Sequence, residues 1–99
     1  MRVLVEDDGF TSQLSILGNL PFVDEAIRGV TNAIANFAEA FDLVPGYRQL
    51  RIAKTDNFDT ARGSLAPLRI YFHIMDENRV KLLWVERTDD KPGLLDDEE

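Results

Sequence analysis

The sequence predicts an α+β domain in which two helices pack on an antiparallel sheet. Apolar and polar residues alternate along residues 68–87, as expected for a β-hairpin, whereas apolar residues recur every three or four positions along residues 23–41, as expected for a helix. A chain of 99 residues with 44% hydrophobic residues can bury one core, so residues 1–88 are expected to form a single domain. The expected order of elements is β-α-α-β-β-β, followed by an acidic segment at residues 89–99.

Residues 1–6 (Met-Arg-Val-Leu-Val-Glu) predict a short strand, and Asp7-Asp8-Gly9 ends it. A short helix should follow, with Thr11 or Ser12 as its N-terminal cap. We expect the first strand to pair with the strands at the other end of the chain. The inward residues of the helix are Phe10, Leu14 and Leu17, which have helical spacing.

The second helix has the clearest apolar periodicity in the chain. Val44-Pro45-Gly46 should end it. Asp24 and Glu25 near its start interact favourably with the positive end of the helix dipole. A coiled-coil dimer would show the same pattern, which keeps a homodimer open, but the run is shorter than three heptads and favours packing on the core. Its apolar seam comprises Val23, Ile27, Val30, Ile34, Phe37 and Phe41.

Residues 47–54 predict the next strand, with Leu50 and Ile52 facing the core and Gln49, Arg51 and Ala53 facing outward. Residues 55–67 are rich in turn formers and are expected to form a long connection.

Residues 68–87 predict a hairpin with two chemically different faces. In a chain of net charge −7, cations gathered on one face indicate an anionic partner. The simpler alternative is that these arginines pair with Glu77, Glu86 or the acidic segment, that His73 is merely solvated, and that Tyr71 packs on Leu83. The expected core face holds Leu68, Ile70, Phe72, Ile74, Val80, Leu82 and Trp84. The expected opposite face holds Arg69, Tyr71, His73, Arg79, Lys81 and Arg87.

The acidity of the chain is concentrated at its end. Residues 88–99 carry a net charge of −5, against −2 for the other 87 residues. Such acidic runs are typical of solvated tails. The alternative is that the segment folds back over the basic sheet face, anchored by Leu94 and Leu95.

Several kinds of site are not expected. The absence of cysteine excludes disulfides and thiolate metal ligands, and a single histidine excludes a histidine-pair metal site. The glycines form no phosphate-binding loop, so we expect neither a metal nor a cofactor. No signal peptide or membrane-spanning run is visible, which predicts a cytoplasmic protein without a membrane partner.

The order of elements and the hairpin Leu-Arg-Ile-Tyr-Phe-His-Ile…Arg-Val-Lys-Leu-Leu-Trp-Val-Glu-Arg resemble the RelE/ParE toxin superfamily. Arg69 begins the penultimate strand and Arg87 ends the last one, as is common in that family. The resemblance implies a toxin of a toxin–antitoxin pair with an antitoxin protein as partner. It implies one of two actions, ribosome-dependent mRNA cleavage or binding to gyrase.

For the nuclease branch, the resemblance implies that Arg69 stabilises the phosphate and that Arg87 is a second phosphate-binding or general-acid group. Tyr71 and His73 would stack on a base or transfer a proton. The supporting nucleic-acid-binding cations would be Arg51, Lys54, Arg79 and Lys81. Two alternatives remain on the same scaffold. One is a non-catalytic module that binds a protein through its sheet face or acidic tail, and the other is a toxin-like protein whose tail replaces the antitoxin.

Overall fold

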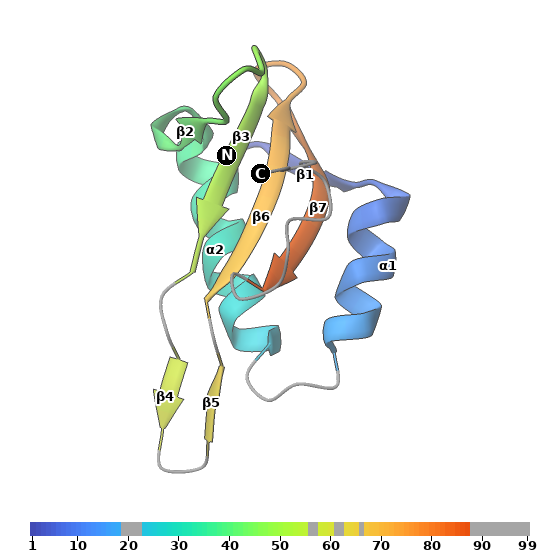
Figure 1. Ribbon diagram of the computed structural model, residues 1–99. Helices are drawn as coiled ribbons and strands as arrows, with labels where there is room; N and C mark the ends of the chain where they lie inside the picture. The colour runs from blue at the N-terminus through green and yellow to red at the C-terminus, as the bar shows by residue number, and fades with distance from the viewer. Residues whose placement is uncertain (19–22, 56–57, 61–62, 66, 88–99) are drawn as a thin grey trace.

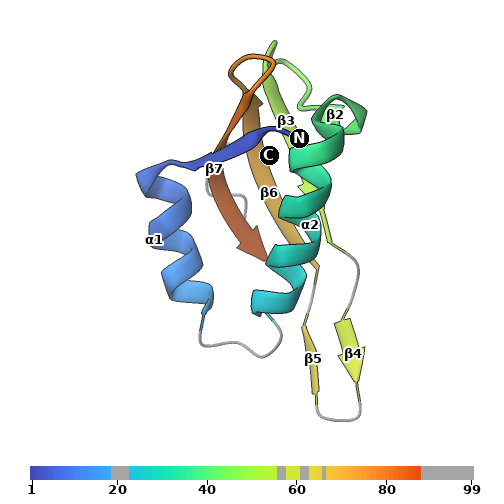
Figure 2. The same ribbon diagram turned by 180° about the vertical axis from the view of Figure 1, so that it is seen from behind.

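The computed structural model describes residues 1–18, 23–55, 58–60, 63–65 and 67–87. It confirms the predicted α+β class, with two helices packed on a five-stranded mixed sheet (Figure 1). The α2 helix lies over one face of the sheet, and Figure 2 views the molecule from the side on which α2 lies in front of the sheet. The elements are β1 (Val3–Glu6), α1 (Asp8–Leu17), α2 (Val23–Phe37), the 3-10 helix η1 (Ala38–Ala40), β2 (Asp42–Leu43), β3 (Leu50–Lys54), β4 (Phe58–Thr60), β5 (Gly63–Leu65), β6 (Leu68–Ile74) and β7 (Arg79–Arg87).

The strand order in the main sheet is β1-β7-β6-β3-β2. Strands β3, β6 and β7 form the predicted antiparallel meander. The first strand pairs with it as expected, running parallel to β7. The predicted long connection was wrong in one respect, because β4 and β5 pair as a separate two-stranded hairpin that projects beyond the main sheet (Figure 1).

The α1 helix begins earlier than the capping residues predicted. Asp7 is the cap, and its Oδ2 accepts a hydrogen bond from the Gly9 N–H at 3.1 Å, so Thr11 and Ser12 are not the caps. The β1 strand pairs with β7 only as far as Leu82. The α1 helix, which follows β1, also contacts β7 (Figure 1). A Cβ at Gly9 would lie 3.1 Å from the Leu83 carbonyl oxygen, so only glycine fits this close approach without a shift.

The α2 helix packs on the sheet largely through its predicted seam, but it ends at Phe37 rather than at Val44-Pro45-Gly46. Ile34 is fully buried, whereas Phe37 is 65% exposed, which corrects its place in the seam. The backbone leaves the helical conformation at Phe37 (φ −138°), and a 3-10 turn follows. Phe41 therefore reaches the core from an extended backbone, and its ring meets Phe72 edge-on at 5.7 Å between centroids.

The β3 strand faces the opposite way from the prediction. Ala53 pairs with Ile70 and Arg51 pairs with Phe72, so both lie on the helix-covered face. Ala53 is 1% exposed and belongs to the hydrophobic core. Leu50 and Ile52 consequently lie on the other face, because side chains alternate along a strand and a shift of one residue exchanges the two faces.

An irregularity in the hairpin changes the faces of its last residues. Tyr71 pairs with Trp84 and Phe72 pairs with Leu82, which leaves Leu83 as an extra residue in β7. Val80 and Leu82 face the core as predicted, but Trp84 does not, and Val85 takes its place. Arg87 now pairs with the buried Leu68 and leaves the face on which it was expected.

Candidate functional site

The surface that the sequence predicted as functional is the face of the sheet opposite α2, here called the open sheet face. In the part of the chain that the structure describes, no helix lies over it (Figure 1). Strand register places six of the eight predicted site residues there and excludes Arg51 and Arg87. The six are Lys54, Arg69, Tyr71, His73, Arg79 and Lys81. Their apolar neighbours on the face are Val3, Val5, Leu50, Ile52 and Trp84.

Arg69 is held by a buried carboxylate, Glu86. The Arg69 Nε and Nη2 atoms lie 3.0 and 2.9 Å from Glu86 Oε2, and Nη2 also donates to the Arg87 carbonyl oxygen at 3.0 Å. The indole Nε1 of Trp84 donates to Glu86 Oε1 at 2.9 Å, and the Tyr71 hydroxyl lies 3.4 Å from Oε2. We call Arg69, Tyr71, Trp84 and Glu86 the Glu86 cluster.

The hairpin register builds this cluster. Arg69 lies opposite Glu86, and Tyr71 lies opposite Trp84, which the extra residue in β7 has moved to this face. Glu86 is 3% exposed and Tyr71 is 1% exposed, so the charge of the carboxylate is compensated inside the protein. Burial, and then the negative charge of Glu86, raise the pKa of the Tyr71 phenol.

Glu86 was predicted only as one of several ion partners of the arginines. The irregularity in β7 was not visible in the sequence, so Trp84 was assigned to the core. The pairing of Arg69 with Glu86 depends on the same extra residue, because the register at the turn, with Ile74 opposite Val80, would continue to place residue 85 opposite residue 69. The sequence therefore held no signal for the cluster beyond naming Glu86 as an ion partner.

Two further cations of the open sheet face also have acidic neighbours. Arg79 pairs with Asp76 at 2.9 Å, and this hydrogen bond, followed by one from the Asn78 N–H, lowers the pKa of the Asp76 carboxyl. Lys81 Nζ lies 3.6 Å from Asp7 Oδ1. Both pairs are solvated, so they contribute little to stability, but they reduce the positive potential of the face.

Lys54 and His73 are different from these cations. Within the described ranges, neither side chain forms an ion pair with an acidic residue. The Lys54 side chain is exposed, and His73 is half-buried between Leu50 of β3 and Lys81 of β7. Lys54 lies opposite Arg69 of β6, and Tyr71 separates Arg69 from His73 along this face of the strand.

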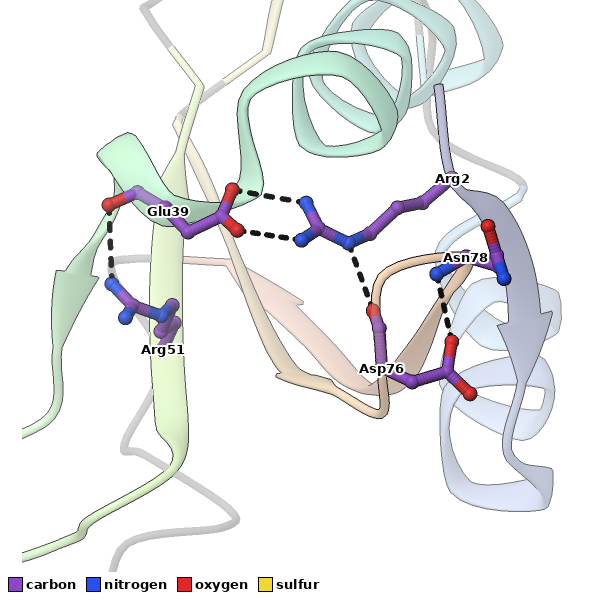
Figure 3. A network of polar contacts seen from close by, with 5 residues as sticks. All are labelled: Arg2, Glu39, Arg51, Asp76 and Asn78. Atoms are coloured by element: carbon purple, nitrogen blue, oxygen red, sulfur yellow. Dashed lines mark hydrogen bonds and ion pairs between the residues drawn. The ribbon is translucent and has the colours of Figure 1, made fainter.

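Arg51, predicted to contact nucleic acid, instead ties β3 to the segment after α2. Its Nη1 donates to the Phe41 carbonyl oxygen at 2.6 Å. The same atom donates to the Glu39 carbonyl oxygen at 3.3 Å (Figure 3). The Glu39 carboxylate accepts hydrogen bonds from Arg2, which lower the pKa of Glu39, and Arg2 Nε donates to the Asp76 carbonyl oxygen at 3.0 Å (Figure 3). This network joins the start of β1 to η1 and to the β6–β7 turn.

A pocket of about 300 Å³ lies at the margin of the open sheet face, beside β3. Lys54 and Ile52 of β3 form one side of it. Ala40, Phe41 and Asp42 form the other. Its walls are partly apolar and include the charged side chains of Lys54 and Asp42. It therefore suits a ligand in which an apolar group lies next to a polar one.

Of the residues predicted for a nuclease site, Arg51 and Arg87 do not lie on the open sheet face with the other six. Arg69 is bound to Glu86, and Arg51 faces the helices. Among the described residues, no group of three or more His, Cys, Asp or Glu side chains is placed to hold a metal ion. Over the same residues, the helices are too short or too polar to cross a membrane.

Comparison with protein-family models gave no match for this chain. Comparison with curated proteins gave no match either.

Proposed function

We propose that this protein is a non-catalytic interaction module on a RelE/ParE-type scaffold, and that its open sheet face binds a protein partner. The observation that carries the proposal is the Glu86 cluster. A phosphate-stabilising arginine must direct its N–H groups at the substrate, whereas Arg69 directs Nε and Nη2 at a carboxylate buried in its own sheet.

The charge balance also favours a protein over a nucleic acid as the partner. Binding to RNA or the ribosome gains most of its affinity from cations that replace counterions on phosphates. Here Arg69, Arg79 and Lys81 each have an acid within 4 Å. A face that combines paired charges with Val3, Val5 and Ile52 resembles the mixed surface of a protein–protein interface.

Site-specific photocrosslinking tests the proposal. A photoreactive amino acid replaces His73, at the centre of the open sheet face, and in the matched control it replaces Asn32, which is exposed on α2. In an extract of the source organism, the His73 variant should give a discrete protein adduct that the Asn32 variant does not. The proposal fails if His73 yields no protein adduct, or if both positions yield the same adducts.

A toxin acting on mRNA translation or gyrase is the second candidate, because Lys54, Arg69, Tyr71 and His73 do share one face. Cell-free translation with mapping of mRNA ends tests the nuclease branch, using the intact chain and a variant in which Lys54 and His73 are both alanine. Cleavage by the intact chain that disappears in this variant would support the toxin and overturn the non-catalytic proposal. A DNA supercoiling assay tests the gyrase branch with the same pair of proteins.

A further inference from the structure

The outer edge of β3 is only partly covered by its neighbour. The β2 strand has two residues, which pair with Ile52 and Arg51. The Leu50 carbonyl accepts from the Val44 N–H at 2.8 Å on this side, whereas the Thr55 N–H donates to Leu68 on the β6 side at 2.9 Å. Backbone groups alternate along a strand, so those of Lys54 point to the outer edge, where no described strand lies beside it.

The pocket beside β3 lies at the same place. Ile52 and Lys54 contribute to both the pocket and the open strand edge. An extended segment that runs along this edge could hydrogen-bond to the Lys54 backbone and place an apolar side chain in the pocket. Acidic residues next to that side chain would meet the Lys54 ammonium group, which has no acidic partner among the residues described.

Residues 88–99 of this chain carry the matching chemistry. Leu94 and Leu95 are followed directly by four acidic residues, and the whole segment has a net charge of −5. The segment follows Arg87, which pairs with Leu68 of β6. On its other side, Leu68 is hydrogen-bonded to Thr55, the residue after Lys54. Arg87 and Lys54 are thus about 10 Å apart across two strand spacings, whereas seven extended residues after Arg87 reach about 23 Å.

We propose that residues 88–99 bind in cis to the margin of the open sheet face, with Leu94 or Leu95 in the pocket beside β3, and compete there with the protein partner. This inference rests on the proposed function, because competition requires that the face has a partner. Tethering supplies an effective concentration of roughly 1 mM, so a segment with an intermolecular Kd of about 0.1 mM would occupy the site about nine-tenths of the time.

Engineered disulfides test the position of the segment in the full chain, because the protein contains no cysteine. The test variant carries Asp42→Cys in the pocket with Gly93→Cys beside the two leucines. The matched control carries Asn32→Cys on the exposed face of α2 with the same Gly93→Cys. We expect intramolecular disulfide formation in the test variant to be at least about tenfold faster, after correction for the reactivity of each thiol with an external disulfide.

Charge reversal then tests the chemistry of the contact. Lys54→Glu in the test variant should slow disulfide formation about threefold or more. Arg28→Glu makes the same change of charge on α2 and should leave the rate unchanged. The inference is overturned if the two cysteine pairs react equally fast, if the product is mainly intermolecular, or if both charge reversals have the same effect.

A final measurement separates this inference from the proposed function. Photocrosslinking through residue 73 is repeated with the disulfide of the test variant closed and then reduced. The inference predicts that closing the disulfide weakens the partner adduct at least about threefold and that reduction restores it. An adduct of equal strength in both states refutes the competition and leaves the proposed function standing. A disulfide that forms rapidly without any adduct in either state refutes the proposed function and leaves the cis contact standing.

Discussion

Replacing Glu86 with glutamine should destabilise the domain far more than breaking a surface ion pair. The Glu86 side chain is 4% exposed and that of Arg69 is 13% exposed, so the substitution leaves a buried guanidinium beside a neutral amide. Removing one partner of a buried pair costs about 3–5 kcal/mol. For a domain of this size, 1 kcal/mol corresponds to a change in Tm of roughly 4–8 °C, so Glu86→Gln should lower Tm by more than about 12 °C.

The matched control is Arg79→Gln, which breaks the pair with Asp76. The side chains of Arg79 and Asp76 are 53% and 42% exposed, so the loss should be below about 1 kcal/mol. Urea unfolding followed by circular dichroism measures both variants. The double substitution Arg69→Met with Glu86→Leu should recover most of the lost stability, because it removes both buried charges together. The reasoning is refuted if Glu86→Gln and Arg79→Gln cost the same, or if the double substitution is no more stable than Glu86→Gln.

Three further predictions concern other parts of the molecule. Gly9→Ala should destabilise the domain by about 1–3 kcal/mol, because the added Cβ would lie 3.1–3.2 Å from atoms of Leu83 and Trp84 in β7. Gly29→Ala should stabilise α2 by about 0.5–1 kcal/mol, because a Cβ there meets no atom within 4 Å. The melting temperatures of the two variants should therefore shift in opposite directions. Arg51→Met should cost about 1.5–3 kcal/mol by removing two hydrogen bonds to carbonyl oxygens, and a loss below 0.5 kcal/mol in urea unfolding would contradict that role. Because the pKa of the Tyr71 phenol is raised in the folded protein, this phenol ionises at lower pH in the unfolded chain. The stability that it contributes is therefore complete below pH 10 and is lost as pH rises through its folded pKa. Tyr71→Phe should lose less stability above pH 10 than the intact protein, and an unchanged pH profile would count against the prediction.

The overall architecture could be predicted from the sequence because its periodicities are strong. The spacing of Val23, Ile27, Val30 and Ile34 admits only a helix, and alternation along residues 68–74 admits only a strand with one buried face. The helix and the strand are both confirmed, but Tyr71 on the opposite face of the strand is buried as well. Phe37 was misplaced because periodicity alone does not show where a helix gives way to a 3-10 turn.

The errors at the candidate site come from register. The side chain of Ala53 is too small to reveal which face of β3 is buried, and the long Arg51 side chain reaches carbonyl oxygens from the core-facing side. In β7, a single extra residue moves Trp84 from one face to the other. One position of slip in a strand reverses every following side chain, so a correct pairing of strands still gave a partly wrong site.

The state of the Arg69 guanidinium group distinguishes a non-catalytic module from a nuclease most directly. Nitrogen-15 NMR of arginine side chains measures it in the intact protein, with the Arg69 signal identified by its loss in Arg69→Lys. If Glu86 holds Arg69, its Nε–H signal should exchange slowly with water and should not shift when a short single-stranded RNA is added. A rapidly exchanging Arg69 signal that shifts on addition of the RNA would show an arginine available to phosphate, and would contradict the non-catalytic account.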